Sequence, residues 1–363
     1  MFYQLFYPLR ELFFGFNVFK YITFRSAMGG AFAFLLCVFV GPWFVRKLTQ
    51  LKLGEHIIEK EISATLHSLH SEKKGIPTMG GVLILFSAVF STLLWARLDN
   101  RYVLLALFSI IWLGIVGFID DYLKILRQRS KGMTKTAKFV GQTILAVIVG
   151  LFAFYDPQIG PYLDIPFLKN LLINLGLFYI FFVFLVIVGS SNAVNLTDGL
   201  DGLAVGCVIM VAFTYSVFSY VTGHANISAY LQINYVAGSG ELAVFCACLA
   251  GSALGFLWFN AHPAQVFMGD TGSLSLGGAL GVVAVLIKKE LLLLLVGGVF
   301  VAEAVSVILQ VASFRWTGKR IFLLAPLHHH FQLRGLAESK VTIRFWIIGI
   351  ILALVGLATL KLR

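Results

Sequence analysis

Only 17 of the 363 residues are acidic, and five aspartates among them lie in short polar segments at the ends of apolar runs. These five are Asp120, Asp121, Asp198, Asp201 and Asp270. Carboxylates beside a membrane or an apolar interior are costly unless a cation or hydrogen-bond donors accompany them. Magnesium typically binds proteins through one or two carboxylates together with substrate phosphates. The aspartates therefore predict a Mg²⁺ site that handles phosphates.

Asp120 and Asp121 follow the apolar run that ends at Ile119. Adjacent carboxylates repel each other, and the helix dipole disfavours anions at a helix C-terminus. Either Mg²⁺ or the nearby Lys124 is therefore expected to compensate this charge. The alternative is an ordinary helix end exposed to solvent.

The segment Asn192–Gly202 carries two asparagines, two aspartates and two glycines between apolar runs. Asp198 and Asp201 are three residues apart and share one face if this stretch opens a helix. Carboxylates in a first helical turn also stabilise the helix, so capping is an alternative. The density of polar groups, with Asn192 and Asn195 among them, favours recognition of a polar substrate.

The segment Asn260–Ser273 places Asp270 at a predicted helix start, where free backbone N–H groups can bind an anion. A simple N-cap is the alternative for this aspartate. Phe267 offers a face on which a nucleobase can stack, or else ordinary packing at the membrane edge. This segment therefore extends the predicted phosphate site toward a nucleotide.

Three consecutive histidines, His328 to His330, offer donors to phosphate, proton transfer or metal ligation. Zinc is disfavoured because the sequence has no second cluster of ligands at Cys/His spacing. Lys73 and Thr78 lie in a glycine-rich basic segment that suits phosphate contact, although basic residues are common at membrane edges. Together these elements suit the transfer of a phosphoryl-linked group from a soluble nucleotide conjugate to a lipid phosphate.

The elements that must position these residues are membrane helices. The chain is 59% hydrophobic and 12% charged, which is about half the charge of a typical soluble protein. Ten apolar runs approach the roughly 20 residues that a helix needs to cross a bilayer. They lie near Ser26–Val45, Met79–Trp95, Tyr102–Ile119, Phe139–Phe154, Leu172–Gly189, Leu200–Val221, Leu242–Phe259, Leu274–Ile287, Leu291–Phe314 and Thr342–Leu360. We therefore expect an all-α integral membrane protein with ten transmembrane helices. Residues 1–363 are expected to form a single polytopic domain, in which residues 1–21 are an interfacial amphipathic segment.

Lysines and arginines set the expected orientation. They concentrate after the first, third and ninth runs, as at Arg46, Lys124 and Arg320, whereas the opposite loops hold few. Cytoplasmic loops carry such an excess, so both termini are expected in the periplasm and the aspartates and histidines at the cytoplasmic face. The net charge of +11 lies in these short loops with no nucleic-acid-binding pattern, so no nucleic acid is expected as a partner. The four cysteines lie within apolar runs and are expected to be buried.

Six motifs closely resemble those of the polyprenyl-phosphate N-acetylhexosamine-1-phosphate transferases: PTMGG, FIDDY, NAVNLTDGLDGLA, FLWFN, PAQVFMGD and PLHHHF. The resemblance covers nearly the whole chain and is strongest to the phospho-N-acetylmuramoyl-pentapeptide-transferases. It implies ten membrane helices in the bacterial inner membrane, a cytoplasmic site, Mg²⁺ as cofactor and a homodimer. It also implies transfer of phospho-MurNAc-pentapeptide from UDP-MurNAc-pentapeptide to undecaprenyl phosphate, which gives lipid I and UMP.

The resemblance further implies roles for individual residues. Asp120, Asp121 and Asp270 would be catalytic and would hold the metal, with Asp120 the base toward the lipid phosphate and Asp270 the main ligand. The uridine-diphosphate part would be bound by Lys73, Thr78, Asn195, Asp198, Asp201 and Phe267. The phosphate and sugar region would be lined by Lys124, Asn192, Asn260 and the catalytic histidines His328, His329 and His330. Lys138 completes the predicted substrate-binding set.

Two departures from the family pattern, at Ile76 and in the run His67–Glu72, bear on the contacts of Lys73. One alternative within the same chemistry is a transferase specific for UDP-GlcNAc, against which PLHHHF argues. An alternative from another class is an ion-coupled transporter that uses Glu303 and the aspartates as a proton path. Transport sites usually lie near the bilayer midplane, whereas these acids lie mostly at one edge. Glu303, inside the ninth run, is expected either to be a paired structural group or to shape a lipid channel.

Overall fold

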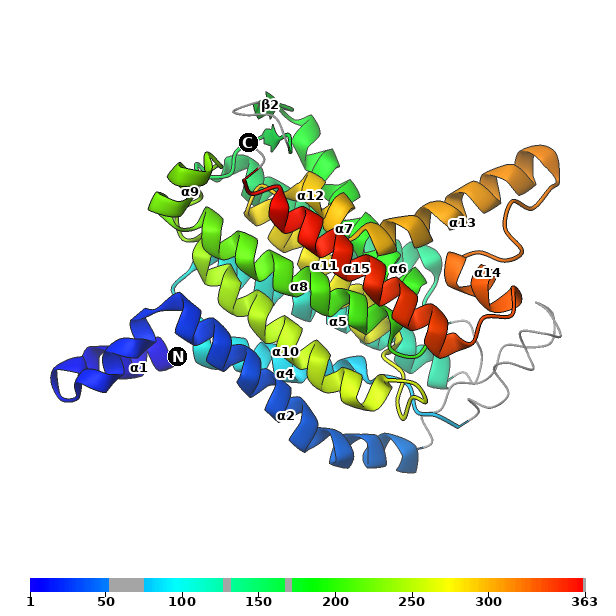
Figure 1. Cartoon of the computed structure of the whole chain (residues 1–363), viewed down its shortest axis with the longest axis horizontal. Helices are drawn as coiled ribbons and strands as arrows, with labels where there is room; N and C mark the ends of the chain where they lie inside the picture. Colours follow the sequence, from blue (N-terminus) through cyan, green and yellow to red (C-terminus); the bar gives the residue numbers. More distant parts are fainter. Residues whose placement is uncertain (52–74, 127–131, 167–171, 362–363) are drawn as a thin grey trace.

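The computed structural model describes residues 1–51, 75–126, 132–166 and 172–361, so Lys73 and the run His67–Glu72 lie outside the described residues. Within them, nine helices are long and apolar enough to cross a membrane. They are α2 (Ile22–Gln50), α5 (Arg101–Leu126), α6 (Lys135–Tyr155), α7 (Phe178–Thr197), α8 (Leu203–Thr222), α10 (Leu242–Asn260), α11 (Gly269–Leu286), α13 (Gly298–Thr317) and α15 (Glu338–Ala358). The chain is therefore a helical, multi-pass integral membrane protein (Figure 1).

The apolar helix α4 (Gly81–Trp95) has only 15 residues. At 1.5 Å per residue it spans about 22 Å, less than the hydrocarbon thickness of roughly 30 Å. The expected count of ten crossings therefore stays a prediction. Four shorter helices lie between the later spans, namely α9 (Ala225–Leu231), η3 (Ser239–Glu241), α12 (Glu290–Val296) and α14 (Leu327–Leu333).

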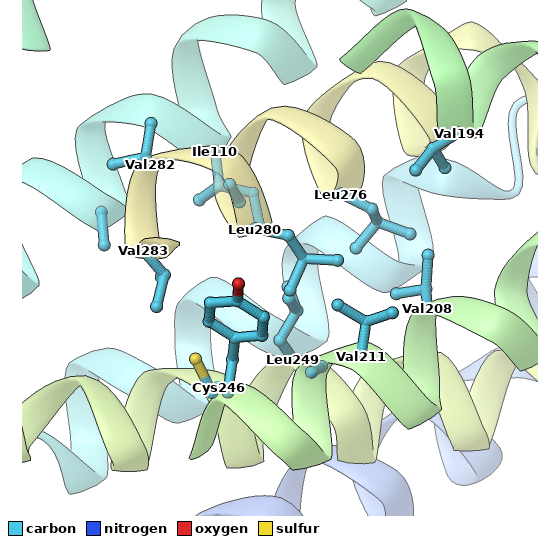
Figure 2. Packing of buried hydrophobic residues seen from close by; sticks show 14 of the residues in the cluster. Ile110, Val194, Val208, Val211, Cys246, Leu249, Leu276, Leu280, Val282 and Val283 are labelled. Atoms are coloured by element: carbon cyan, nitrogen blue, oxygen red, sulfur yellow. The ribbon is translucent and has the colours of Figure 1, made fainter. Parts of the chain in front are cut away.

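Helix α11 is the centre of the bundle. Every residue after its first two is buried, and it packs against α4, α5, α7 and α8. A helix that is apolar on all sides is expected to be buried on all sides. Figure 2 shows its Leu276 and Leu280 in the cluster that also holds Val194 of α7, Val208 of α8 and Leu249 of α10. The helix that carries Asp270 is therefore held by the protein on every side.

A glycine brings α5 close to the start of α11. A Cβ atom on Gly117 would overlap the carbonyl oxygen of Asp270. Small residues allow such close approach between membrane helices. The contact places Asp120 and Asp121, one turn further along α5, beside the first turn of α11.

The expected helix Leu172–Gly189 is wrong in its first part. Strand β2 (Leu172–Asn174) pairs antiparallel with β1 (Tyr162–Asp164), and α7 begins only at Phe178. Gly176, with a φ of +53°, adopts the left-handed conformation between the strand and the helix. A short apolar run does not by itself distinguish a strand from the start of a helix.

The expected ninth helix, Leu291–Phe314, is also wrong as a single element, because it is broken at Gly297 into α12 and α13. Two successive glycines, Gly297 and Gly298, weaken helix propagation at this point. In Figure 1, α13 leans out from the bundle toward the upper right, and α14 lies below it, next to the lower end of α15.

The expected sixth helix, Leu200–Val221, begins at Leu203 instead. Gly202 precedes it with a φ of +72°, in the left-handed region that a regular right-handed helix excludes. Asp198 is the C-cap residue of α7, and Asp201 lies in the turn before α8. The two aspartates therefore do not share a helical face.

A charged cluster ties the β hairpin to the turn between α11 and α12. Lys289 Nζ lies 2.5 Å from an Asp164 carboxylate oxygen, and both side chains are buried. Lys288 Nζ donates to the carbonyl oxygens of Gly160 and Tyr162. Burial and pairing make these two lysines a structural clasp.

Residues before α2 form short helical turns, namely α1 (Phe2–Phe6), η1 (Tyr7–Glu11) and η2 (Phe14–Lys20). Within them, the ring of Phe6 stacks on Phe16 and on Phe19. Leu12, Phe13 and Phe14 expose most of their surface. An apolar edge of this kind suits a membrane surface, and the interfacial location stays a prediction.

Candidate active site

Asp270 is the point at which four helices meet. It lies in the first turn of α11. Its Oδ2 atom accepts hydrogen bonds from Lys124 of α5 at 2.9 Å and from Lys138 of α6 at 2.8 Å. Its Oδ1 atom accepts from the amide of Asn195 on α7 at 2.6 Å. Charge-assisted bonds from three directions fix this carboxylate in one place.

Asp120 shares a lysine with Asp270. Its Oδ2 atom lies 2.8 Å from Lys124 Nζ, and its Oδ1 atom accepts the backbone N–H of Met133 at 2.7 Å. The side chain is 5% exposed, whereas that of Lys124 is 35% exposed. The carboxylate is therefore sheltered but paired with a cation that solvent reaches.

Asp121 has a different set of partners. It accepts the backbone N–H groups of Asp270 and Thr271, at 3.1 and 2.9 Å, and the hydroxyl of Thr271 at 2.7 Å. These donors belong to the first turn of α11, which has unpaired N–H groups like every helix start. Asp121 therefore anchors α11 to α5.

The three carboxylates can together hold a divalent cation. Asp120, Asp121 and Asp270 each offer an oxygen atom within 4.8 Å of the others. Two lysines lie among them, so three carboxylates face two ammonium groups and the cluster keeps one excess negative charge. Hard oxygen donors and residual negative charge fit Mg²⁺.

Asn192 lies about one turn before Asn195 on α7 and joins a polar network. Its amide donates to Gln142 of α6 at 3.0 Å, and Gln142 donates to Ser191 at 3.0 Å. Ser191 in turn donates to the Leu274 carbonyl of α11. This network holds α6 and α7 against α11 next to the carboxylates.

Asp201 and Asn260 lie in a second cluster, away from the bonds to Asp270. Asp201 Oδ2 lies 3.0 Å from His262 Nδ1 and accepts the N–H of Ala264. The backbone N–H of Asp201 donates to Glu338 at the start of α15. Asn260 accepts the N–H of Gly202 and donates to the Val266 carbonyl. The cluster thus fastens two loops to α15.

Thr78 and Phe267 lie on paired segments of backbone. Phe267 N–H donates to the Pro77 carbonyl, and Gly80 N–H donates to the Phe267 carbonyl, each at 2.8 Å. A Cβ atom on Gly269 would lie 3.1 Å from Thr78 Oγ1 and 2.7 Å from Asp121 Oδ2. Thr78 therefore lies beside the carboxylate cluster, and Phe267 precedes Asp270 by three residues.

The three histidines differ in their surroundings. His328 is buried, with Nδ1 3.2 Å from a carboxylate oxygen of Glu303 on α13. His329 is partly exposed and contacts Gln332. His330 is buried and accepts the N–H of Leu323 at Nδ1, and burial lowers its pKa. Of the three, His329 is the one most open to a substrate.

The sequence does not predict the partners of three side chains at these sites, namely Glu303, Thr271 and His262. Thr271 directly follows Asp270 and lies in the polar segment Asn260–Ser273, so the sequence does place its hydroxyl near the carboxylate. Nothing in the sequence pairs Glu303 with His328, because they lie on different helices. The role of each predicted site residue stays a prediction. The residues that meet at one point are Asp120, Asp121, Lys124, Lys138, Asn195 and Asp270, whereas Asp201, Asn260 and the three histidines make other contacts.

Comparison with known proteins identifies the families and the individual proteins that this chain resembles. Residues 103–288 match the model "Glycosyl transferase family 4", and residues 73–85 match "Phospho-N-acetylmuramoyl-pentapeptide-transferase signature 1". The phospho-N-acetylmuramoyl-pentapeptide-transferases of Desulfotalea psychrophila and Citrifermentans bemidjiense are 55% and 54% identical to it, over the full length of both chains in each case. That of Desulforapulum autotrophicum is 52% identical, also over the full length of both.

The chain belongs to the phospho-N-acetylmuramoyl-pentapeptide-transferase family. It is therefore a transferase, as the motifs predicted. The family signature ends inside α4 and contains Thr78, which lies beside the carboxylate cluster. The match to the glycosyl transferase family 4 model includes the residues that meet at the cluster, namely Asp120, Asp121, Lys124, Lys138 and Asp270.

Proposed function

We propose that the chain transfers phospho-MurNAc-pentapeptide from UDP-MurNAc-pentapeptide to undecaprenyl phosphate, and so forms lipid I and UMP in peptidoglycan synthesis. Its membership of the phospho-N-acetylmuramoyl-pentapeptide-transferases supports this reaction. The observation that carries it is the meeting of Asp120, Asp270 and two lysines at one point among membrane helices. Such a point can hold a diphosphate next to a lipid phosphate.

Mg²⁺ is the proposed cofactor, and Asp270 and Asp120 are its proposed ligands, with Asp121 behind them. Asp121 already accepts three hydrogen bonds from α11, so its remaining capacity for a metal is smaller. When bound, Mg²⁺ polarises a phosphate oxygen and neutralises its charge. Lys124 and Lys138, which reach the same Asp270 oxygen, stabilise the remaining negative charge of the diphosphate.

In the proposed reaction Asp120 accepts the proton of the lipid phosphate. The freed oxygen forms a bond to the β-phosphorus of the sugar nucleotide, and the bond from that phosphorus to the bridging oxygen breaks. UMP leaves with the electron pair. Asp120 is held for this role by Lys124 on one oxygen and the Met133 N–H on the other, so little reorganisation is needed at the moment of transfer.

The proposed substrate contacts surround this centre. Thr78, Asn195, Asp198, Asp201 and Phe267, together with Lys73, are assigned to the uridine-diphosphate part. Asn192, Asn260, Lys138, Lys124 and the histidines are assigned to the phosphates and sugar. His329, the most exposed of the three histidines, is the one proposed to touch the substrate.

The proposed topology has ten crossings, with α4 as the tenth helix, both termini in the periplasm and the site at the cytoplasmic face of the inner membrane. It rests on the lysines and arginines of the loops, such as Arg46, Lys135 and Arg320. We further propose one polytopic domain over residues 1–363, an interfacial segment at residues 1–21, and assembly as a homodimer.

The test is release of UMP by purified protein with undecaprenyl phosphate and Mg²⁺. UDP-MurNAc-pentapeptide is expected to give UMP, UDP-GlcNAc is expected to give little, and a chelator is expected to stop the reaction. Turnover of UDP-GlcNAc alone would favour the rival transferase. Absence of UMP with either nucleotide would refute the proposed reaction.

A further inference from the structure

The carboxylate of Glu303 is paired with the first of the three histidines. Both side chains are almost fully buried, at 0% and 1% exposed. Oε1 accepts the backbone N–H of His328 at 3.2 Å, and Oε2 lies 3.2 Å from its Nδ1 atom. A carboxylate at one ring nitrogen fixes the orientation of an imidazole and favours a proton on that nitrogen. Glu303 therefore holds the backbone of His328 by a hydrogen bond and contacts its ring through an ion-pair distance without hydrogen-bond geometry.

The opposite edge of this ring rests on the loop between α7 and α8. A Cβ atom on Gly199 would overlap His328 Nε2. In the described part of the chain, neither ring nitrogen of His328 has a hydrogen-bond partner, and neither has the Oε2 atom of Glu303. A buried polar atom without a partner calls for an explanation. Here the ring is held against the glycine by the carboxylate behind it.

The loop that receives the ring connects the carboxylate cluster to the proposed nucleotide contacts. It follows Asn195, whose amide binds Asp270, and the N–H of Asp198 donates to the Asn195 carbonyl at 3.3 Å. Asp198 directly precedes Gly199 in the chain. A shift of the ring is therefore transmitted directly to Asp198.

We propose that Glu303 and His328 are positioning residues, which hold the loop Asp198–Gly202 in the place where it binds the nucleotide. Neither group touches the reacting atoms in this proposal, since the ring is covered by the loop. The proposal rests on the proposed function, because it assigns Asp198 to the uridine-diphosphate part of the substrate. It gives Glu303 a role other than a proton path or a lipid channel.

The test compares UDP binding by calorimetry in the full-length protein and in three variants. Glu303→Gln keeps the size of the side chain and an acceptor for the His328 N–H, but removes the charge that holds the ring. Gly199→Ala keeps the pair and displaces the ring. Each is expected to weaken UDP binding roughly tenfold, the usual scale for an outer positioning group. The double variant is expected to match the single ones, because both changes remove one shared contact.

Glu290→Gln is the matched control, because Glu290 is also buried but bonds Tyr179 at 2.7 Å, near the hairpin clasp. It is expected to leave UDP affinity unchanged. In UMP release, Glu303→Gln is expected to raise the KM for the nucleotide and leave the KM for undecaprenyl phosphate unchanged. A general loss of structure would change both constants and the melting temperature.

Unchanged UDP affinity in Glu303→Gln, or an equal loss in Glu290→Gln, would overturn the positioning role. So would a roughly hundredfold loss in the double variant, which is the additive result. If Gly199→Ala does not fold, the nearly isosteric Glu303→Gln decides the matter alone. Failure of the wild-type protein to bind UDP would instead refute the proposed function itself.

Discussion

Asp121 of α5 accepts hydrogen bonds from both the backbone N–H and the hydroxyl of Thr271, at 2.9 and 2.7 Å. The residue before α11, Met268, has no side chain that can cap the helix. Asp121 therefore acts as the N-cap of α11, because it accepts hydrogen bonds from the first turn of that helix although it belongs to α5. Asp120 and Asp121 consequently have different roles: Asp121 caps α11, whereas Asp120 is the proposed base.

Asp121→Ala is expected to lower the free energy of unfolding by about 1–2 kcal/mol, as for loss of a cap, and to reduce UMP release. Asp120→Asn is expected to reduce UMP release by about 10²–10⁴-fold, the scale of general-base catalysis, with little change in melting temperature. Thermal unfolding and UMP release in the same detergent measure both. Thr271→Val is the control and should lower the melting temperature in the same direction as Asp121→Ala. An Asp121→Ala protein that melts like the wild type would contradict the capping role.

Lys138→Met is expected to lower turnover while reducing the Mg²⁺ concentration needed for half-maximal rate. The ammonium group lies 2.8 Å from the Asp270 oxygen, where it repels a divalent cation bound to the same carboxylate. Titration of UMP release with Mg²⁺ measures the change. Lys135→Met removes an exposed lysine of the same helix and should change neither value. A higher Mg²⁺ requirement in Lys138→Met would show that the lysine assists metal binding.

Gly117→Ala is expected to destabilise the protein by about 1–3 kcal/mol, the usual cost of overpacking, and to reduce turnover, because the added methyl overlaps the Asp270 carbonyl. The matched control is Gly189→Ala on α7, where an added Cβ meets nothing within 4 Å. That change should be neutral or stabilising by roughly 0.5–1 kcal/mol. Melting curves and UMP release distinguish the two. Equal effects at both glycines would argue against the close contact of α5 with α11.

His330 is expected to make stability depend on pH. Burial, with a smaller contribution from Arg334, lowers its pKa below 6.5, and Nδ1 must be unprotonated to accept the Leu323 N–H. The neutral ring thus stabilises the fold fully above pH 6.5, and this contribution is lost as the pH falls from 6.5 toward the lower folded value. Melting temperatures measured between pH 7.5 and 5.5 should fall less in His330→Gln than in the wild type. Parallel curves would show that His330 does not titrate with folding.

Sequence patterns anticipated the carboxylate cluster because its members are costly polar groups at the ends of apolar runs. They did not anticipate that Asp121 caps α11, since a cap from another helix depends on how α5 and α11 pack. The pairing of Glu303 with His328 was hidden for the same reason. These contacts arise from tertiary packing, which spacing along one chain does not report.

The errors in the helices have a common cause, which is glycine. Gly202 delays the start of α8, and Gly297 divides the expected ninth helix. Both glycines can be read from the sequence, but the hydropathy of a span is set by the apolar residues around them, so a hydropathy pattern does not show the break. The strand Leu172–Asn174, which lies just before Gly176, was predicted as part of a helix for the same reason. Local backbone chemistry therefore competes with hydropathy at the ends of each span.

The burial of α11 has a consequence for how the protein is made. Among the described spans it has the lowest mean hydropathy, and its first turn carries Asp270, so it partitions poorly into lipid on its own. Its neighbours α4, α5, α7 and α8 all precede it in the chain, so they are synthesised first. We expect α11 to leave the translocation machinery only when those helices can receive it, which makes completion of the carboxylate cluster coincide with a late step of membrane insertion.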